Sequence, residues 1–168
     1  MSNDVNTSQE LVRMYGKDFY AFSEHAHKMK SDYGNLFKIP GVGNLSEFNI
    51  SFATSLKDRH VGPDVGKLLI LDVVSDILVR HKPLTTLRWL SDYLARRKVE
   101  GFTILATLSP LVVTSKEETQ PIIDSFDGVI EIYEKTLGER ARRFVVIKKM
   151  QGRRYLDTDL LLDRDKLF

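Results

Sequence analysis

Two runs of consecutive apolar residues dominate the middle of the chain. The first run, Lys67–Val74, is almost wholly aliphatic, and the second is Phe102–Leu108. A continuous aliphatic run is typical of a strand that is buried on both faces of a parallel sheet. Between the runs, apolar residues recur every three or four positions over Pro83–Val99, which predicts a helix with proline in its first turn. Strand, helix and strand in this order predict an α/β fold.

These two strands should form the centre of the core. We expect Leu69, Leu71 and Ile104 to be almost fully buried in adjacent parallel strands. Neither strand should be open to solvent over one whole face.

The first third of the chain carries shorter patterns that predict small elements. Phe48, Ile50 and Phe52 alternate with polar residues, as in a half-buried strand. The predicted elements are a helix at Ser8–Tyr15 that Gly16 ends, a strand at Asp18–Phe22, a helix at Glu24–Tyr33, a loop at Gly34–Glu47, a strand at Phe48–Phe52 and a polar loop at Leu56–Gly66.

The last third changes from helical to strand patterns. A helix is predicted at Ser115–Phe126, with acidic residues in its first turn. Strand-like runs then follow without a helix at Val129–Tyr133, Arg143–Lys149 and Tyr155–Leu162, with turn signals near Gly138 and Gly152. We therefore predict one α/β domain over residues 1–168, with a mixed, mainly parallel sheet flanked by helices and an antiparallel C-terminal meander.

Composition narrows the function classes. The 168 residues include no cysteine, which excludes thiolate metal sites, thiol catalysis and a disulfide scaffold. No apolar run approaches the roughly 20 residues of a membrane span, and the polar start lacks a signal-peptide pattern. We therefore expect a cytoplasmic protein that does not insert into membranes. The net charge of +2 is too small to indicate a nucleic-acid partner by itself.

Polar residues at the ends of apolar strands are the first candidates for chemistry, because ligands of open α/β sheets bind at the carboxyl ends of strands. Ser23 and Glu24 end one predicted strand, Asp72 ends the aliphatic strand, and Thr107 and Ser109 end the next. Asp72 could orient a magnesium-bound water and Glu24 could polarise an attacking water. The structural alternative, that Asp72 only caps the following turn, is about equally favoured.

The order of these segments resembles the archaeal branch of the RecA superfamily, the KaiC-like ATPases. The resemblance extends from Gln9 to the C-terminus through YAFSE, FNISFA, LLILDVVSD, FTILATLS, SFDGVIEI and RFVVIKKMQGRR. It implies that Asp72 is the magnesium-side acid of the Walker B strand and that Glu24 occupies the catalytic glutamate position. It also implies that Lys149, with Arg153, resembles the basic group that reaches the nucleotide of a neighbouring subunit.

The chain also departs from the pattern of that family. A phosphate loop of the form G-x-x-x-x-G-K-[ST] should precede Leu11, but Asn3–Ser8 has neither glycine nor lysine and carries an acid. Gln151 stands where the family usually has arginine, and Glu24 is single where paired acids are common. Either the reading frame begins late or the chain is a degenerate, non-hydrolysing relative, which would need no cofactor.

Three other features are interpreted as structural. The glycine-rich segment Pro40–Ser46 follows no aliphatic strand and precedes no convincing helix, so we interpret it as a plain loop. The four histidines are not spaced as ligands of a metal on one element. Trp89 and Tyr93, four residues apart, favour a packing pair over a base-stacking platform.

One charge cluster stands out near the C-terminus, where basic residues occur with no acid between them. The basic cluster consists of Arg140, Arg142, Arg143, Lys148, Lys149, Arg153 and Arg154. Those at hairpin ends could converge into an anion-binding edge. The alternative, slightly favoured, is protection of an edge strand against aggregation.

The function that these patterns favour is a regulatory or interaction module, acting through self-association or by pairing with an ATPase paralogue. An assembly of this kind should bury more than ~1,000 Å² in total, with the basic cluster at or beside the interface. The alternative is an ATP- and magnesium-dependent ATPase that is N-terminally truncated or has a noncanonical phosphate site. A nucleic-acid partner recruited by the basic cluster is the third hypothesis.

Overall fold

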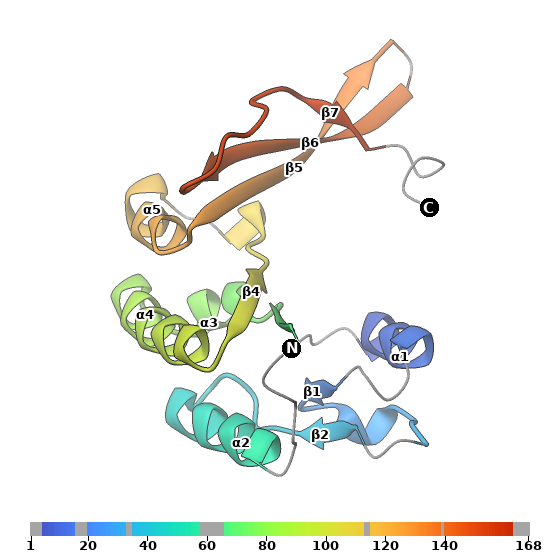
Figure 1. Cartoon of the computed structure of the whole chain (residues 1–168), viewed down its shortest axis with the longest axis vertical. Coiled ribbons are helices and arrows are strands. Elements are labelled where there is room, and N and C mark those ends of the chain that lie inside the picture. The colour runs from blue at the N-terminus through green and yellow to red at the C-terminus, as the bar shows by residue number, and fades with distance from the viewer. Residues whose placement is uncertain are drawn as a thin grey trace. The chain divides into compact units, whose positions relative to one another are not determined.

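The computed structural model describes residues 5–15, 20–32, 35–57, 66–112, 115–138 and 140–162 (Figure 1). The chain divides into two compact units, an N-terminal unit of Met1–Thr119 and a C-terminal unit of Gln120–Phe168. The prediction of a single domain over residues 1–168 stays a prediction.

The N-terminal unit alternates strands and helices. Its elements are α1 (Val5–Tyr15), β1 (Ala21–Ser23), the 3-10 turn η2 (Ala26–Lys28), β2 (Leu36–Lys38), α2 (Leu45–Lys57), β3 (Lys67–Leu71), α3 (Val74–Arg80), α4 (Pro83–Val99), β4 (Phe102–Ala106), the 3-10 turn η3 (Pro110–Val112) and the start of α5 (Lys116–Asp124). Strand β1 pairs in parallel with β2, and β3 pairs in parallel with β4. The predicted α/β class is therefore confirmed.

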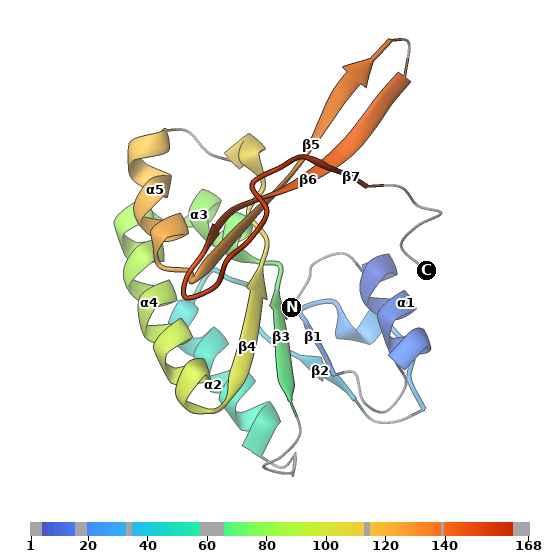
Figure 2. The same ribbon diagram turned by 45° about the horizontal axis from the view of Figure 1, so that its top comes forward.

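The predicted central strands pair as expected but are covered on one face. Leu69 lies opposite Ile104 in the register, and Leu69 and Leu71 are buried. Helix α4 packs against β4 on one side of the two strands (Figure 2). On the opposite face Leu68 and Leu105 are 61% and 50% exposed. The prediction of burial on both faces is therefore wrong for this sheet.

Ile104 is the specific error in the predicted core, since it is half-buried and not fully buried. The reason is the width of the sheet. Among the described strands β4 pairs only with β3, so Ile104 has a neighbouring strand on one side. The α/β class does not depend on that second side, because the parallel pairing and the crossover helix define it.

An aromatic cluster fills the space between β1, α2 and α4. The ring of Phe52 lies 4.8 Å from that of Phe22 on β1, and the ring of Phe48 lies 5.9 Å from that of Trp89 on α4. Trp89 and Tyr93 stack at 5.0 Å. The prediction that Trp89 and Tyr93 form a packing pair is confirmed.

This cluster also explains why the predicted strand at 48–52 is wrong. Phe48 and Phe52 are four residues apart and both 1% exposed, so they occupy one buried face of helix α2. The same two residues satisfy the alternation of a strand, since a spacing of four fits both periods. Asn49, between them, accepts a hydrogen bond from the Trp89 indole at 3.0 Å.

The other N-terminal predictions were partly correct. The helix that ends at Tyr15 and the strand that ends near Phe22 are present, although residues 16–19 lie outside the described part. The helix predicted from Glu24 is wrong, because only the short turn η2 forms before Met29 becomes extended. The loop predicted over 34–47 contains β2 and the start of α2, and the polar loop predicted from Leu56 begins inside α2; residues 58–65 are outside the described part.

The C-terminal unit is an antiparallel sheet that follows the end of α5. Strands β5 (Gly128–Leu137) and β6 (Arg140–Met150) form a long hairpin, and β7 (Leu160–Leu161) pairs with β6. Gly138 and Gly152 adopt positive φ angles of 65° and 71°, which explains why glycine marks both turns. The antiparallel meander is therefore confirmed, although its strands form a sheet separate from the two parallel ones.

The third strand is much shorter than predicted. Of the predicted 155–162 run, only Leu160 and Leu161 form the strand β7, and the Leu162 amide adds one hydrogen bond to the Arg143 carbonyl at 2.9 Å. The residues before them attach to the sheet through side chains, because the Tyr155 hydroxyl donates to the Lys148 carbonyl and Asp159 pairs with Lys135. In the described residues no helix is long and apolar enough to cross a membrane.

Candidate functional site

The carboxyl ends of β3 and β4 bring together Asp72 and Thr107, two of the polar residues that the sequence singled out. The Thr107 hydroxyl donates a hydrogen bond to the Asp72 carboxylate, and the Thr107 amide donates to the Leu71 carbonyl at 3.2 Å. Asp72 is exposed. The parallel register places these two strand ends side by side, so an exposed carboxylate and a hydroxyl share one edge.

A second pair of residues extends the same edge. The Ser75 hydroxyl, at the start of α3, accepts a hydrogen bond from the Ser109 amide at 2.9 Å. The contact joins the first turn of α3 to the segment after β4. The geometry suits a site for a polar ligand at the strand ends.

Glu24 and Ser23 lie at the end of a different sheet. Ser23 is buried and its hydroxyl accepts the His25 amide at 3.1 Å, which holds the turn after β1. The Glu24 carboxylate lies 3.5 Å from the His25 ring, an ion pair when the imidazole is protonated. Asp72 and Glu24 therefore end strands of two separate sheets and do not share one sheet edge.

The glycine-rich segment has a context that the sequence did not predict. It follows β2 and leads into α2, where the Asn44 side chain accepts the Glu47 amide at 3.2 Å. The expectation that no helix follows it is therefore wrong. A Cβ at Gly41 would meet the end of the Glu24 side chain, so the Glu24 carboxylate lies directly against this glycine. A carboxylate at this position repels phosphate, so the loop has the geometry but not the charge of a phosphate site.

The basic cluster is divided over the hairpin. Arg140 and Arg142 lie near the Gly138 turn, whereas Arg153 and Arg154 follow the opposite end of β6. An 11-residue strand separates the two groups by roughly 30 Å. The structure therefore does not bring the seven residues to one edge.

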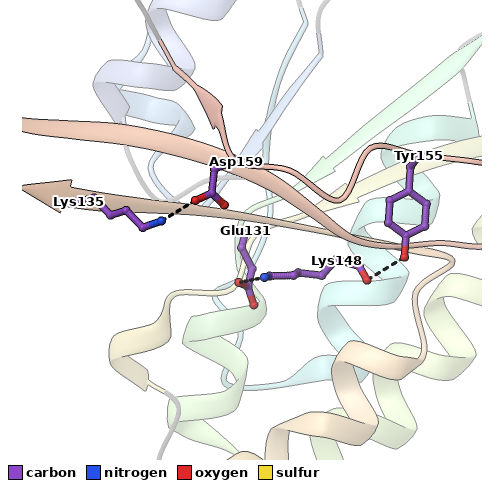
Figure 3. Close-up of polar contacts among 5 residues, drawn as sticks. All are labelled: Glu131, Lys135, Lys148, Tyr155 and Asp159. Atoms are coloured by element: carbon purple, nitrogen blue, oxygen red, sulfur yellow. Dashed lines mark hydrogen bonds and ion pairs between the residues drawn. The ribbon is translucent and has the colours of Figure 1, made fainter. Parts of the chain in front are cut away.

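Several members of the cluster already have partners within the C-terminal unit. Arg143 pairs with Glu134 across the strands at 2.9 Å, and Lys148 lies 3.9 Å from Glu131 (Figure 3). Lys149, the candidate nucleotide-binding residue, donates to the Asp124 carbonyl at the end of α5 at 3.1 Å. Lys149 and Arg153 belong to the C-terminal unit, whereas Asp72 and Glu24 belong to the N-terminal unit.

One surface ion pair, in which both partners have shifted pKa values, joins β5 to the segment before β7. Lys135 and Asp159 approach to 2.5 Å (Figure 3). The hydrogen bond from Lys135, followed by one from Tyr133, lowers the pKa of Asp159, and the bond to Asp159 raises the pKa of Lys135. This pair attaches the segment before β7 to β5.

Magnesium binding by this chain would depend mainly on ligands outside the protein. The described residues contain no group of three or more His, Cys, Asp or Glu side chains that could hold a metal. Asp72 with the Thr107 hydroxyl supplies one carboxylate, which suits a cation held largely by water and substrate phosphates. The donor set therefore fits magnesium only as a companion of a bound phosphate.

Sequence reasoning missed the surroundings of Arg97. This side chain is 6% exposed and lies 5.2 Å from the Phe52 ring and 5.3 Å from the Tyr93 ring. Burial raises the pKa of the Tyr93 hydroxyl well above its ordinary value. The repeat of Trp89, Tyr93 and Arg97 at a spacing of four was the signal that places Arg97 on the buried face of α4.

The comparisons with known proteins identify the fold. No protein-family model and no curated protein matches the sequence. A solved structure, that of a KaiC-like protein from the hyperthermophilic archaeon Pyrococcus horikoshii, is similar with a TM-score of 0.55 and 20% identity over 82% of this chain. The similarity establishes a KaiC-like fold, and this chain covers 59% of that protein.

Proposed function

We propose that this KaiC-like chain is a non-hydrolysing interaction or regulatory module that acts through self-association or by pairing with an ATPase paralogue. The observation that supports the proposal is a KaiC-like fold whose 168 residues contain no G-x-x-x-x-G-K-[ST] sequence. The amides and the lysine of that loop provide most of the affinity for phosphates. Asp72 alone replaces neither.

The glycine-rich loop does not substitute for the phosphate loop. It has the order of strand, loop and helix, but Glu24 lies against Gly41 and the loop itself, residues 40–46, contains no lysine or arginine. Negative charge at a helix N-terminus opposes binding of another anion. This arrangement supports a role without nucleotide turnover.

Exposed apolar residues support association. Leu68 and Leu105 are exposed on the uncovered face of the β3 and β4 pair. Parallel sheets are usually covered on both faces, and a partner could cover this one. The proposed assembly buries more than ~1,000 Å² in total.

The association is tested by sedimentation at micromolar concentration. The wild-type chain should sediment as an assembly of 19.3 kDa subunits. A Leu68→Lys, Leu105→Lys double variant should dissociate, and Leu84→Lys, at an exposed position on α4, should not. A clean monomer in the wild type, or equal association of all three proteins, would contradict the proposal.

Nucleotide turnover is tested separately. Titration of the chain with labelled ATP and magnesium should show no micromolar binding and no hydrolysis. Micromolar binding together with turnover that Asp72→Ala abolishes would overturn the non-hydrolysing role and favour an ATPase. The bond between Asp72 and Thr107 is the specific feature that supports this alternative, because it holds the carboxylate at the strand ends.

A further inference from the structure

A concave surface of the N-terminal unit lies at the end of β3 and β4 that is opposite to Asp72. The amino ends of both strands and the carboxyl-terminal turns of α2 and α4 line an open cleft of about 410 Å³. Ala53, Leu56 and Phe102 form its apolar wall. Small-molecule sites are concave, mostly apolar and have a few polar groups, so the cleft has suitable walls for a small ligand.

The polar lining of the cleft is mainly cationic. Lys57, Lys67 and Arg97 line it together with one acid, Glu100. The Glu100 carboxylate lies 2.7 Å from the Arg97 guanidinium, so its charge is already paired. Lys67 donates to the Glu100 carbonyl at 3.2 Å and lies 5.7 Å from the centre of the Phe102 ring. Among the described residues the two lysines have no carboxylate partner, which leaves a net positive lining.

Arg97 provides an independent sign that a ligand group belongs here. It is 6% exposed and stacks over two aromatic rings, yet its Nε has no hydrogen-bond partner in the described part of the chain. The hydroxyl of Tyr93, one turn earlier on α4, is also buried without a partner there. A buried donor without an acceptor is destabilising and rare, and a charged one more so. Arg97 lines the cleft, so an acceptor that enters it would meet this side chain, although the Nε atom itself is covered.

We propose that this cleft binds a small organic anion, with a carboxylate or phosphate monoester head and an apolar body about the size of one ring. The anionic head binds the cations of Lys57, Lys67 and Arg97, and the body packs against Leu56 and Phe102. The site is distinct from the strand ends at Asp72, because five residues of β3 separate them by roughly 15 Å. It does not depend on the proposed association.

The test uses phenyl phosphate, benzoate and neutral benzyl alcohol as probes of the full chain. Calorimetric titration should give dissociation constants of about a millimolar for the anions and weaker binding for benzyl alcohol. The tighter of the two anions identifies the head group. Amide shifts in NMR should move at Thr54 and Phe102 and not at Asp72 or Thr107. Equal binding of benzyl alcohol, or shifts at the strand ends instead, would overturn the proposal.

Variants separate recognition of the anion from folding. Arg97→Met should weaken binding of the preferred anion roughly tenfold or more, and Lys57→Gln or Lys67→Gln about threefold each. Arg96→Met, an exposed neighbour on α4, is the matched control and should bind as the wild type does. If Arg97→Met fails to fold, the lysine variants decide, because Lys57 is exposed and Lys67 is only partly buried. Wild-type affinity in both lysine variants would contradict the proposal.

Discussion

The two units of the chain bury their apolar residues to very different extents. In the described residues nearly all buried apolar side chains lie in the N-terminal unit, and only Ile122 and Val146 lie in the C-terminal unit. The long hairpin instead exposes Ile130 and Ile132, at 53% and 65%. Helices α2 and α4 of the N-terminal unit share an aromatic cluster, whereas among the described strands β5 and β6 pair only with each other and with the short β7.

This difference indicates how each unit is stabilised. Burial of large aromatic side chains contributes about 1.5–3 kcal/mol each in the N-terminal unit. In the hairpin, pairs across the strands contribute about 0.2–1 kcal/mol each, such as Tyr133 stacked with Phe144 and Arg143 with Glu134. Mutations should therefore lower the free energy of unfolding strongly in the N-terminal unit and only slightly in the hairpin of the C-terminal unit.

Removal of an aromatic ring from the N-terminal core should have the largest effect. Phe52 is 1% exposed and contacts the rings of Phe22 and Tyr93, so Phe52→Ala should lower the free energy of unfolding by about 3–5 kcal/mol. Ile132→Ala in the hairpin is the matched control and should change it by less than about 0.5 kcal/mol. Urea denaturation measures both values. Equal losses would show that Ile132 contributes as much to stability as a residue of the N-terminal core does.

The two faces of β3 provide a sharper comparison within one strand. Leu69 is 6% exposed and its neighbour Leu68 is 61% exposed. Leu69→Ala should cost about 2–5 kcal/mol, and Leu68→Ala less than about 0.5 kcal/mol in the monomer. Denaturation at low protein concentration measures both. A large loss for Leu68→Ala that grows with protein concentration would mean that a partner covers this face.

The sequence was sufficient to predict the type of an element where its hydrophobic pattern is long. The aliphatic run before Asp72 predicted β3, and the recurrence of apolar residues every three or four positions over 83–99 predicted α4. The burial on both faces that the run also predicted for β3 is wrong. The sequence was insufficient at 48–52. The alternation of a strand and the repeat of a helix both place Phe48 and Phe52 on one buried face. Tertiary contacts select the helix, because the Phe48 ring packs against Trp89 and the Phe52 ring against Tyr93.

The candidate site divides in the same way. The proximity of Asp72 to Thr107 could be predicted, because adjacent parallel strands end at the same edge. The position of Glu24 against Gly41 could not be predicted, since the two residues come from different loops. The cleft beside Arg97 is formed by the last turns of α2 and α4 and the first residues of β3 and β4. No local sequence pattern predicts that these four segments lie together.

Loss of the hydrogen bond between Thr107 and Asp72 should have a moderate effect on the free energy of unfolding. Thr107→Val removes the hydroxyl that donates to Asp72 and keeps the shape of the side chain, so it should lower the unfolding free energy by about 1 kcal/mol. Thr103→Val, exposed on β4, is the control and should change it by a few tenths at most. Equal effects of the two changes would mean that the bond contributes nothing measurable.

The smallest effect should come from the hairpin surface, where Lys135 binds Asp159. The folded pKa of Asp159 is below its ordinary value of 3.8, so its contribution is present above pH 3.8 and disappears as the pH falls through the folded pKa. The folded pKa of Lys135 is above 10.5, so its contribution is present below pH 10.5 and disappears as the pH rises through that pKa. The pair should therefore hold the segment before β7 throughout the neutral range.

The pKa of Asp159 can test this pair even though the pair contributes little to stability, because the groups that lower that pKa differ in their effect. The pKa of Asp159, followed by NMR of its carboxyl carbon, should rise most in Lys135→Met, less in Tyr133→Phe and least in Lys148→Met. The last of these is the control, because Lys148 acts on Asp159 only through space. A rise in Lys148→Met as large as that in Lys135→Met would show that the general positive charge of β6, and not one hydrogen bond, lowers the pKa. In that case the basic cluster would act as one electrostatic field, in spite of its division along the hairpin.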